Sequence, residues 1–141
     1  MNLPASNPAL TTVFRIRDAI NSGRFEGLED LFTEDFLDLT HPSGSPSGIN
    51  GYLESLAYRS RVLRVHVNEN AIIETPDRIV ARVSNHGKGI AEVHGAAAAG
   101  RPYRIDAVHI FHTRGPLISA HWGLRDELDL LVQLGLASPP P

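Results

Sequence analysis

The stretch that decides the fold is Ala107–Asp129, "AVHIFHTRGPLISAHWGLRDELD", in which a turn joins two apolar runs and an acidic cluster follows them. Both runs are rich in Val, Ile and aromatic residues, which favour β-strands. The turn "TRGP" contains Gly and Pro, so the two runs are predicted to form a hairpin. Three histidines and the chain's only tryptophan lie in this hairpin, so it is the first candidate for a functional site.

Strand alternation assigns the side chains of the hairpin to two faces, because successive residues of a strand point in opposite directions. His109 is predicted to share its face with apolar and aromatic neighbours on the first strand. The second strand is predicted to present Trp122 to the same side. We therefore expect one cavity to be lined by Tyr103, His109, Phe111 and Trp122. On the same pattern, His112 and His121 are expected to point away from it.

The residues before this hairpin predict helices followed by strands. Apolar side chains at three- and four-residue spacing in "NPALTTVFRIRDAINSGR" indicate a helix with Asn7 as its N-cap and Gly23 at its end. Shorter apolar stripes predict further helices within residues 25–33 and 49–63. The segment "DFLDLTHPSGSPSG" between them is predicted to begin as a strand and to become a loop.

The second half of the chain is predicted to consist mainly of strands, at residues 62–76, 77–88, 103–114 and 116–124. Residues 89–100 are expected to form a strand followed by a loop, and residues 125–135 a closing helix. This order predicts a single α+β domain over residues 1–136, with a curved antiparallel or mixed sheet wrapped around the N-terminal helices. Residues 137–141, "ASPPP", are expected to form a disordered tail.

Composition restricts the classes of function. The net charge of −3 argues against a nucleic acid or a membrane surface as the main partner, and favours a small apolar ligand. The 141-residue chain has no cysteine, which excludes thiol catalysis and a thiolate zinc site and fits a cytoplasmic location. Neither a signal peptide nor a membrane-spanning segment is expected from its apolar runs.

Three residues of the hairpin region carry both a chemical and a structural interpretation. His109 can exchange a proton near neutral pH or hold an enolate oxygen, but it can equally be a core histidine with one hydrogen bond. Trp122 can stack on a planar ligand or simply pack. Asp126 can act as an acid or base at the pocket mouth, or cap the helix that begins after it.

Other polar residues are weaker candidates. Arg82 can belong to the pocket or to a solvated outer face, and His41 can belong to a lid or be exposed. No metal is expected, because His109 and His112 point to opposite faces of one strand and no recognised metal-ligand spacing occurs. Motifs for nucleotide binding and for serine hydrolases are also missing from the sequence.

The chain as a whole resembles the SnoaL-like polyketide cyclase family of the nuclear transport factor 2-like, or ketosteroid isomerase-like, superfamily. The resemblance lies in "AINSGRFEGLEDLFTEDFLDLT", "GINGYLESL" and "IDAVHIFHTRGPLISAHWGLRDELDLLVQLG". Its most specific part is the C-terminal run that contains His121, Trp122, Asp126 and "QLG". It implies a cone-shaped α+β barrel with a deep apolar pocket, assembled into homodimers or homotetramers through the sheet.

The resemblance also implies cofactor-free ring closure by an intramolecular aldol reaction, with an aspartate as acid and base. His109 matches the family histidine of the penultimate strand, and Trp122 the tryptophan of the last strand. Family cyclases can carry the aspartate directly after this tryptophan, where the present chain has Gly123. Asp126 matches a second acidic position of the family. A histidine that often follows the residue equivalent to Asp38 is displaced here to His41.

These observations lead to three functional hypotheses. The first is a cyclase or isomerase for an apolar, polycyclic carbonyl compound, with Asp126 and His109 as catalytic residues and with Trp122, Tyr103, Phe111, Arg82 and His41 as substrate-binding residues. The second is a non-catalytic ligand-binding or dimerisation module, which Gly123 favours. The third is a hydrolase or a hydroxylation-associated protein, in which Arg82 or His94 would position water.

Overall fold

The computed structural model describes residues 7–40 and 47–141, in which one mixed five-stranded sheet is packed against helices. The strands are β1 (Phe32–Asp38), β2 (His66–Thr75), β3 (Arg78–Lys88), β4 (Pro102–Arg114) and β5 (Leu117–Arg125). They lie in the order β1-β5-β4-β3-β2, in which β1 runs parallel to β5 and every other neighbouring pair is antiparallel. The predicted α+β class and the four predicted strands of the second half are therefore confirmed.

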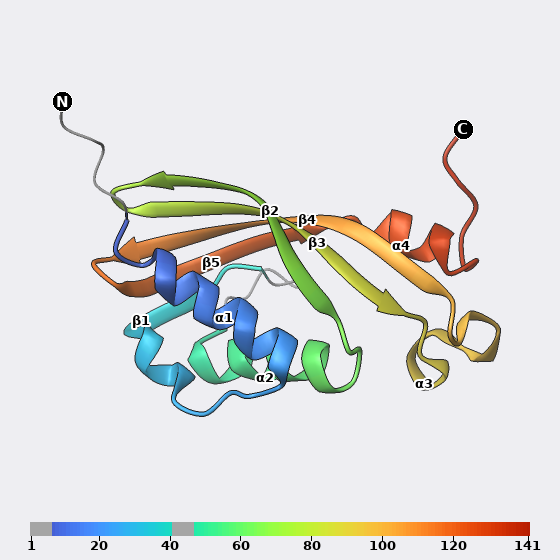
Figure 1. Ribbon diagram of the computed structural model, residues 1–141, viewed down its shortest axis with the longest axis horizontal. Coiled ribbons are helices and arrows are strands. Elements are labelled where there is room, and N and C mark those ends of the chain that lie inside the picture. Colours follow the sequence, from blue (N-terminus) through green and yellow to red (C-terminus); the bar gives the residue numbers. More distant parts are fainter. Residues whose placement is uncertain (1–6, 41–46) are drawn as a thin grey trace.

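Two long helices cover one face of this curved sheet (Figure 1). They are α1 (Leu10–Ser22) and α2 (Ile49–Arg61). A 3₁₀ turn at Leu28–Leu31 joins α1 to β1, and the short helix α4 (Glu127–Gln133) follows β5. No helix within residues 7–40 and 47–141 is both long enough and apolar enough to cross a membrane.

The ends of α1 show how the sequence positions this helix on the sheet. Gly23 ends it in the left-handed conformation at φ 74°, as predicted. Asn7 was predicted to be its N-cap, but the helix begins at Leu10, three residues later. The Asn7 side chain accepts a hydrogen bond from the backbone of Ala9 and donates to Thr113 of β4. Asn7 therefore fastens the start of α1 to the sheet.

The main core fills the space between the two helices and the inner face of the sheet. Its centre includes Ile79 of β3 and Ile118 of β5, both with an exposed fraction of 0%. Phe111 of β4 pairs with Ile79 in register, so the inner face is continuous across the sheet. A second, smaller core lies at the other end of β4 and contains Tyr103, Ile105, Ala98 and Leu134.

Residues 89–100 form no strand, which makes the prediction for this segment wrong. They form a short helix, α3 (Ala91–His94), and a 3₁₀ turn at Ala96–Ala98. Backbone hydrogen bonds from Gly89 to Arg101 and from Gly100 to Gly89 close the segment at its base. A side chain at Gly89 would collide with the backbone of Ala98, so glycine at this position allows the alanine segment to pack closely against the chain.

A β-bulge in β5 changes which side chains face the core. Thr113 pairs with Ile118 and His112 with Ala120, so β5 has one residue more than β4 at this point. Alternation therefore restarts after the bulge, and both Ile118 and His121 point inward although they are three residues apart. The sequence contained no clear sign of this extra residue.

Candidate active site

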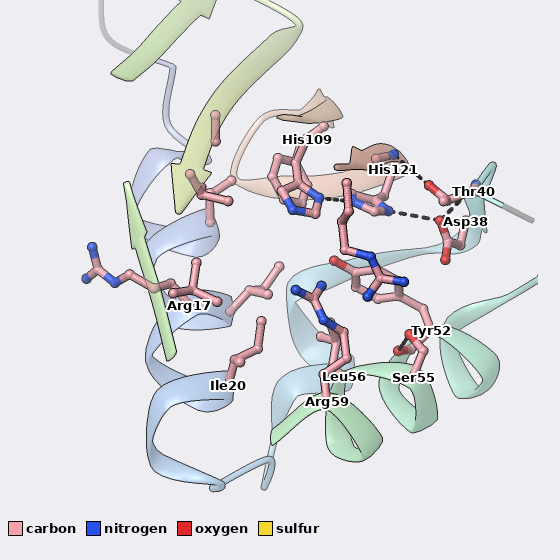
Figure 2. A pocket seen from close by; sticks show the side chains of 18 of the residues that line it. Arg17, Ile20, Asp38, Thr40, Tyr52, Ser55, Leu56, Arg59, His109 and His121 are labelled. Atoms are coloured by element: carbon pink, nitrogen blue, oxygen red, sulfur yellow. Dashed lines mark hydrogen bonds and ion pairs between the residues drawn. The ribbon is translucent and has the colours of Figure 1, made fainter. Parts of the chain in front are cut away.

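A cavity of about 190 Å³ lies between α1, α2 and the inner face of the sheet. Most of its wall is apolar and comes from both helices and from β2, β3 and β4, with side chains that include Val13, Ile16, Ile20, Leu56, Val67, Ala81, Val83 and Phe111. The polar side chains of Asp38, Thr40 and His121 gather at one end of the cavity, apart from Arg17 (Figure 2). The cavity therefore suits an apolar ligand that presents polar atoms at that end.

A chain of three side chains, contributed by three different strands, forms the polar end. Asp38 is the last residue of β1, His121 belongs to β5, and His109 belongs to β4. An Asp38 carboxylate oxygen lies 2.9 Å from Nδ1 of His121, and Nε2 of His121 lies 2.8 Å from Nδ1 of His109 (Figure 2). The centroids of the two imidazole rings are 5.1 Å apart and their planes are inclined by 26°.

The carboxylate determines where the protons lie along this chain. A carboxylate only accepts, so Nδ1 of His121 donates to Asp38, and Nε2 of a neutral His121 must then accept from Nδ1 of His109. That arrangement leaves Nε2 of His109 with a lone pair. Among the described residues, no hydrogen-bond partner of this nitrogen is found, so it is available to a molecule in the cavity.

Burial keeps His109 neutral. It lowers the pKa of His109 well below the ordinary value of 6.5, and the positive charges of Arg59 and Arg125 and the proximity of His121 act in the same direction. At neutral pH His109 is therefore an uncharged imidazole that can accept a proton. A neutral imidazole with one free nitrogen is in the form that a general base requires, and its lowered pKa makes it a weaker base than an exposed histidine.

Tyr52 and Gly123 hold the two histidine rings in place. The Tyr52 ring packs against the ring of His121 at a centroid distance of 4.9 Å, and burial raises the pKa of its phenol, so Tyr52 remains a hydrogen-bond donor. Gly123 lies directly opposite His109 in the sheet. A Cβ atom at Gly123 would lie 2.7 Å from Nδ1 of His109, so the missing side chain makes room for the histidine ring. The backbone NH of Gly123 donates to Thr40 at 2.6 Å.

The structure places two of the predicted site residues, His109 and Phe111, in the wall of the cavity. The expected direction of His121 was wrong, because His121 pairs with Phe111 and points inward beside His109. Trp122 pairs with Ile110 on the outer face of the sheet and is 38% exposed, so the expectation that it lines the cavity was wrong as well. The β5 bulge causes both errors, because it reverses the alternation that was counted from Ile118.

The remaining candidates lie elsewhere or outside the described residues. Tyr103 faces the same side of β4 as His109 but packs in the second, smaller core. Arg82 is exposed on the outer face and forms an ion pair with Asp106 at 3.3 Å. The ring of His94 accepts a hydrogen bond from its own helix, at Ile90. His41 falls within residues 41–46, which the structure does not describe.

Asp126 takes the structural role that the sequence allowed for it. Its carboxylate accepts a hydrogen bond from the backbone NH of Asp129 at 3.0 Å and thereby caps α4. Its side chain is exposed and is not part of the cavity wall. Asp38 is the aspartate that contacts a histidine of the site, His121, instead. Sequence reasoning missed it because Asp38 is separated from His121 by 83 positions and meets it only through the parallel pairing of β1 with β5.

The fold and the cavity place this chain in a class of small α+β proteins, in which a curved sheet and its helices enclose an apolar pocket. The family model for the SnoaL-like polyketide cyclase matches residues 11–134, which is most of the chain. The chain therefore belongs to the SnoaL-like polyketide cyclase family. A comparison with curated proteins found no match.

Solved structures with the same fold include three that cover nearly the whole chain. IdmH from Streptomyces antibioticus, a candidate polyketide cyclase, is 26% identical over 91% of this chain and 98% of its own, with a TM-score of 0.81. AclR from Streptomyces galilaeus, a candidate hydroxylase, is 14% identical over 97% of this chain and 91% of its own, with a TM-score of 0.80. A protein with a ketosteroid isomerase-like fold from Catenulispora acidiphila is 18% identical over 94% and 99%, with a TM-score of 0.71.

The depressed pKa of His109 predicts a specific pH dependence of stability. In the unfolded chain a histidine takes up a proton near pH 6.5, whereas the folded protein resists protonation of His109 until a lower pH. The free energy of unfolding should therefore fall as the pH drops below about 6.5. Between pH 7.5 and 5.5, the free energy of unfolding of His109→Asn should fall by about 1 kcal/mol less than that of the wild type, measured by urea denaturation. Equal losses in both proteins would contradict a buried, neutral His109.

Proposed function

We propose that this protein is an acid/base enzyme that abstracts a proton beside the carbonyl group of an apolar compound and promotes ring closure or isomerisation. The observation that carries the proposal is the Asp38–His121–His109 chain, which ends with a free imidazole nitrogen in an apolar cavity. Membership of the SnoaL-like family supports the cyclase type of reaction. No cofactor is part of this proposal.

The geometry suggests a role for each member of the chain. Nε2 of His109 removes the proton from the carbon next to the carbonyl, and the positive charge that forms is stabilised through His121 by the carboxylate of Asp38. The enolate then attacks a second carbonyl carbon of the same molecule, or it is reprotonated at another carbon. In either case His109 returns the proton, to the new alkoxide or to carbon, so that the catalyst is restored.

Tyr52 is the proposed partner of the substrate oxygen. Its phenol lines the cavity and stays protonated, because burial and the nearby Asp38 both raise its pKa. A neutral donor of this kind stabilises the negative charge that develops on a carbonyl oxygen during enolisation. The proposal therefore combines a base, His109, with a hydrogen-bond donor, Tyr52, at the polar end of an otherwise apolar cavity.

Exchange of carbon-bound hydrogen tests the proposal without knowledge of the natural substrate. In D₂O the wild type should accelerate incorporation of deuterium beside the carbonyl of 2-tetralone, measured by proton NMR against buffer alone. His109→Asn keeps a donor for His121 but lacks the free nitrogen, and it should reduce the rate by about a hundredfold or more. His112→Asn makes the same change on the same strand outside the cavity and should exchange like the wild type.

Asp126→Asn separates the two roles considered for that residue. Asparagine also caps helices, so the fold should be kept and the exchange rate should be unchanged. A loss of exchange in Asp126→Asn but not in His109→Asn would contradict the assignment of the base. Binding of 2-tetralone without any exchange by the wild type would favour the non-catalytic ligand-binding module.

We also propose that the protein forms a homodimer or homotetramer through the outer face of its sheet and acts in the cytoplasm. The outer face presents an apolar patch in which Leu124 is 63% exposed, Trp122 38% and Val108 36%. Val108 lies beside Leu124 in register, and Trp122 lies on the same face. Contiguous exposed apolar side chains of this kind often mark an interface between proteins.

Size-exclusion chromatography with light scattering tests this assembly. The wild type should elute with the mass of two or four chains, and Leu124→Arg should elute with the mass of one chain, because a charge in the patch cannot be buried without cost. A wild-type protein that stays monomeric at high micromolar concentration would contradict the proposed interface.

A further inference from the structure

An arginine on α2 points into the same cavity. Figure 2 shows the Arg59 side chain extending from the helix toward the space between the helices and the sheet. Its Nε and Nη2 atoms are buried, and neither has a hydrogen-bond partner among residues 7–40 and 47–141. A guanidinium group carries a permanent charge and five N–H donors, so leaving it buried and unpaired is costly. Such a cost points to a ligand that completes the site.

The other charged groups of the cavity wall already have partners. Arg17 forms an ion pair with Glu69 at 2.8 Å, and Arg125 forms one with Glu127 at 2.8 Å. Asp38 is engaged by His121. Among the charged side chains that line the cavity, Arg59 is therefore the one for which the described structure shows neither a hydrogen bond nor an ion pair. A buried guanidinium without such a partner is suited to bind an anionic group of a ligand.

Arg59 remains charged in this position. Burial and the nearby charge of Arg125 lower its pKa to about 10, which is still far above neutral pH. The positive charge of Arg59 in turn helps to lower the pKa of His109. An anionic group bound at Arg59 would offset this effect, so that His109 would become a stronger base when the ligand is present.

We propose that Arg59 binds a carboxylate group of the substrate, so that the substrate class is an apolar carbonyl compound bearing one carboxylate. The planar fork of a guanidinium matches the two oxygens of a carboxylate, and the apolar wall accommodates the rest of the molecule. This inference deepens the proposed function and rests on it only in taking this cavity as the substrate site. It assigns Arg59 to binding and orientation, whereas the proton is moved by His109.

A matched pair of two-ring probes tests the carboxylate site. Isothermal titration calorimetry would compare 2-naphthoate with 2-naphthamide, which has nearly the same shape but no charge. The wild type should bind the carboxylate roughly tenfold or more tightly than the amide, as expected for a charge-assisted hydrogen bond. Arg59→Met should bind the two probes about equally, and Arg59→Gln provides a second uncharged variant if the first does not fold.

The control is Arg61→Met, which removes the same charge from the same helix. Arg61 is exposed, donates to the backbone of Gly23 and does not line the cavity, so this variant should keep the preference for the carboxylate. 2-Naphthoate should also raise the melting temperature of the wild type and of Arg61→Met, but not that of Arg59→Met.

Two results would overturn the inference. One is a wild-type protein that binds 2-naphthoate no more tightly than 2-naphthamide, and the other is a preference that persists in Arg59→Met. If the wild type shows no preference for the carboxylate and Arg59→Met loses deuterium exchange, Arg59 would be assigned to the enolate oxygen instead. Failure of the proposed function can be distinguished from failure of this inference, because the two have separate readouts. His109→Asn should lose deuterium exchange, which tests the proposed function, and should keep the preference for the carboxylate, which tests the role of Arg59.

Discussion

The hydrogen bond between the carboxylate of Asp38 and Nδ1 of His121 is the interaction on which the proposed chemistry of this protein depends. Because a carboxylate can only accept, this contact places the proton of a neutral His121 on Nδ1, so that its Nε2 accepts from Nδ1 of His109 and leaves Nε2 of His109 without a proton. Without Asp38, either nitrogen of His121 could carry the proton, and the state of His109 would no longer be determined. The fixed direction of the chain, rather than any single residue, is what makes the cavity a candidate for acid/base catalysis.

The topology of the sheet makes the contact between Asp38 and His121 possible. Parallel pairing places the end of β1 beside β5, so that Asp38 lies next to His121 in register. Antiparallel pairing places Gly123 opposite His109 and leaves space for the imidazole ring. An aspartate at position 123, where family cyclases can carry their acid/base group, would occupy the same space as His109. In the proposed mechanism a histidine takes the place of the carboxylate that the resemblance implied, and the carboxylate of Asp38 lies beyond His121, two residues along the hydrogen-bonded chain.

Local patterns predicted the elements of this fold well, but not the pairing between distant ones. The α1 helix was evident from its apolar spacing and from Gly23, and the four later strands from their β-branched residues and turns. His109 was found because it alternates with apolar residues on one uninterrupted strand. His121 and Trp122 were assigned to the wrong faces, because a bulge of one residue reverses alternation and no residue type marks it reliably. Asp38 and Arg59 could not be recognised from the sequence, since their importance arises only when α2 and β1 meet the sheet.

The protonation state of the two histidines tests the central claim most directly. Long-range proton–nitrogen NMR correlation at pH 7 distinguishes a proton on Nδ1 from one on Nε2 in each imidazole ring. The hydrogen-bonded chain predicts neutral rings for both His109 and His121 with the proton on Nδ1, and loss of this fixed state for His121 in Asp38→Asn. A positively charged His109, or a His109 with its proton on Nε2, would contradict the account, because neither form offers a free nitrogen to the cavity.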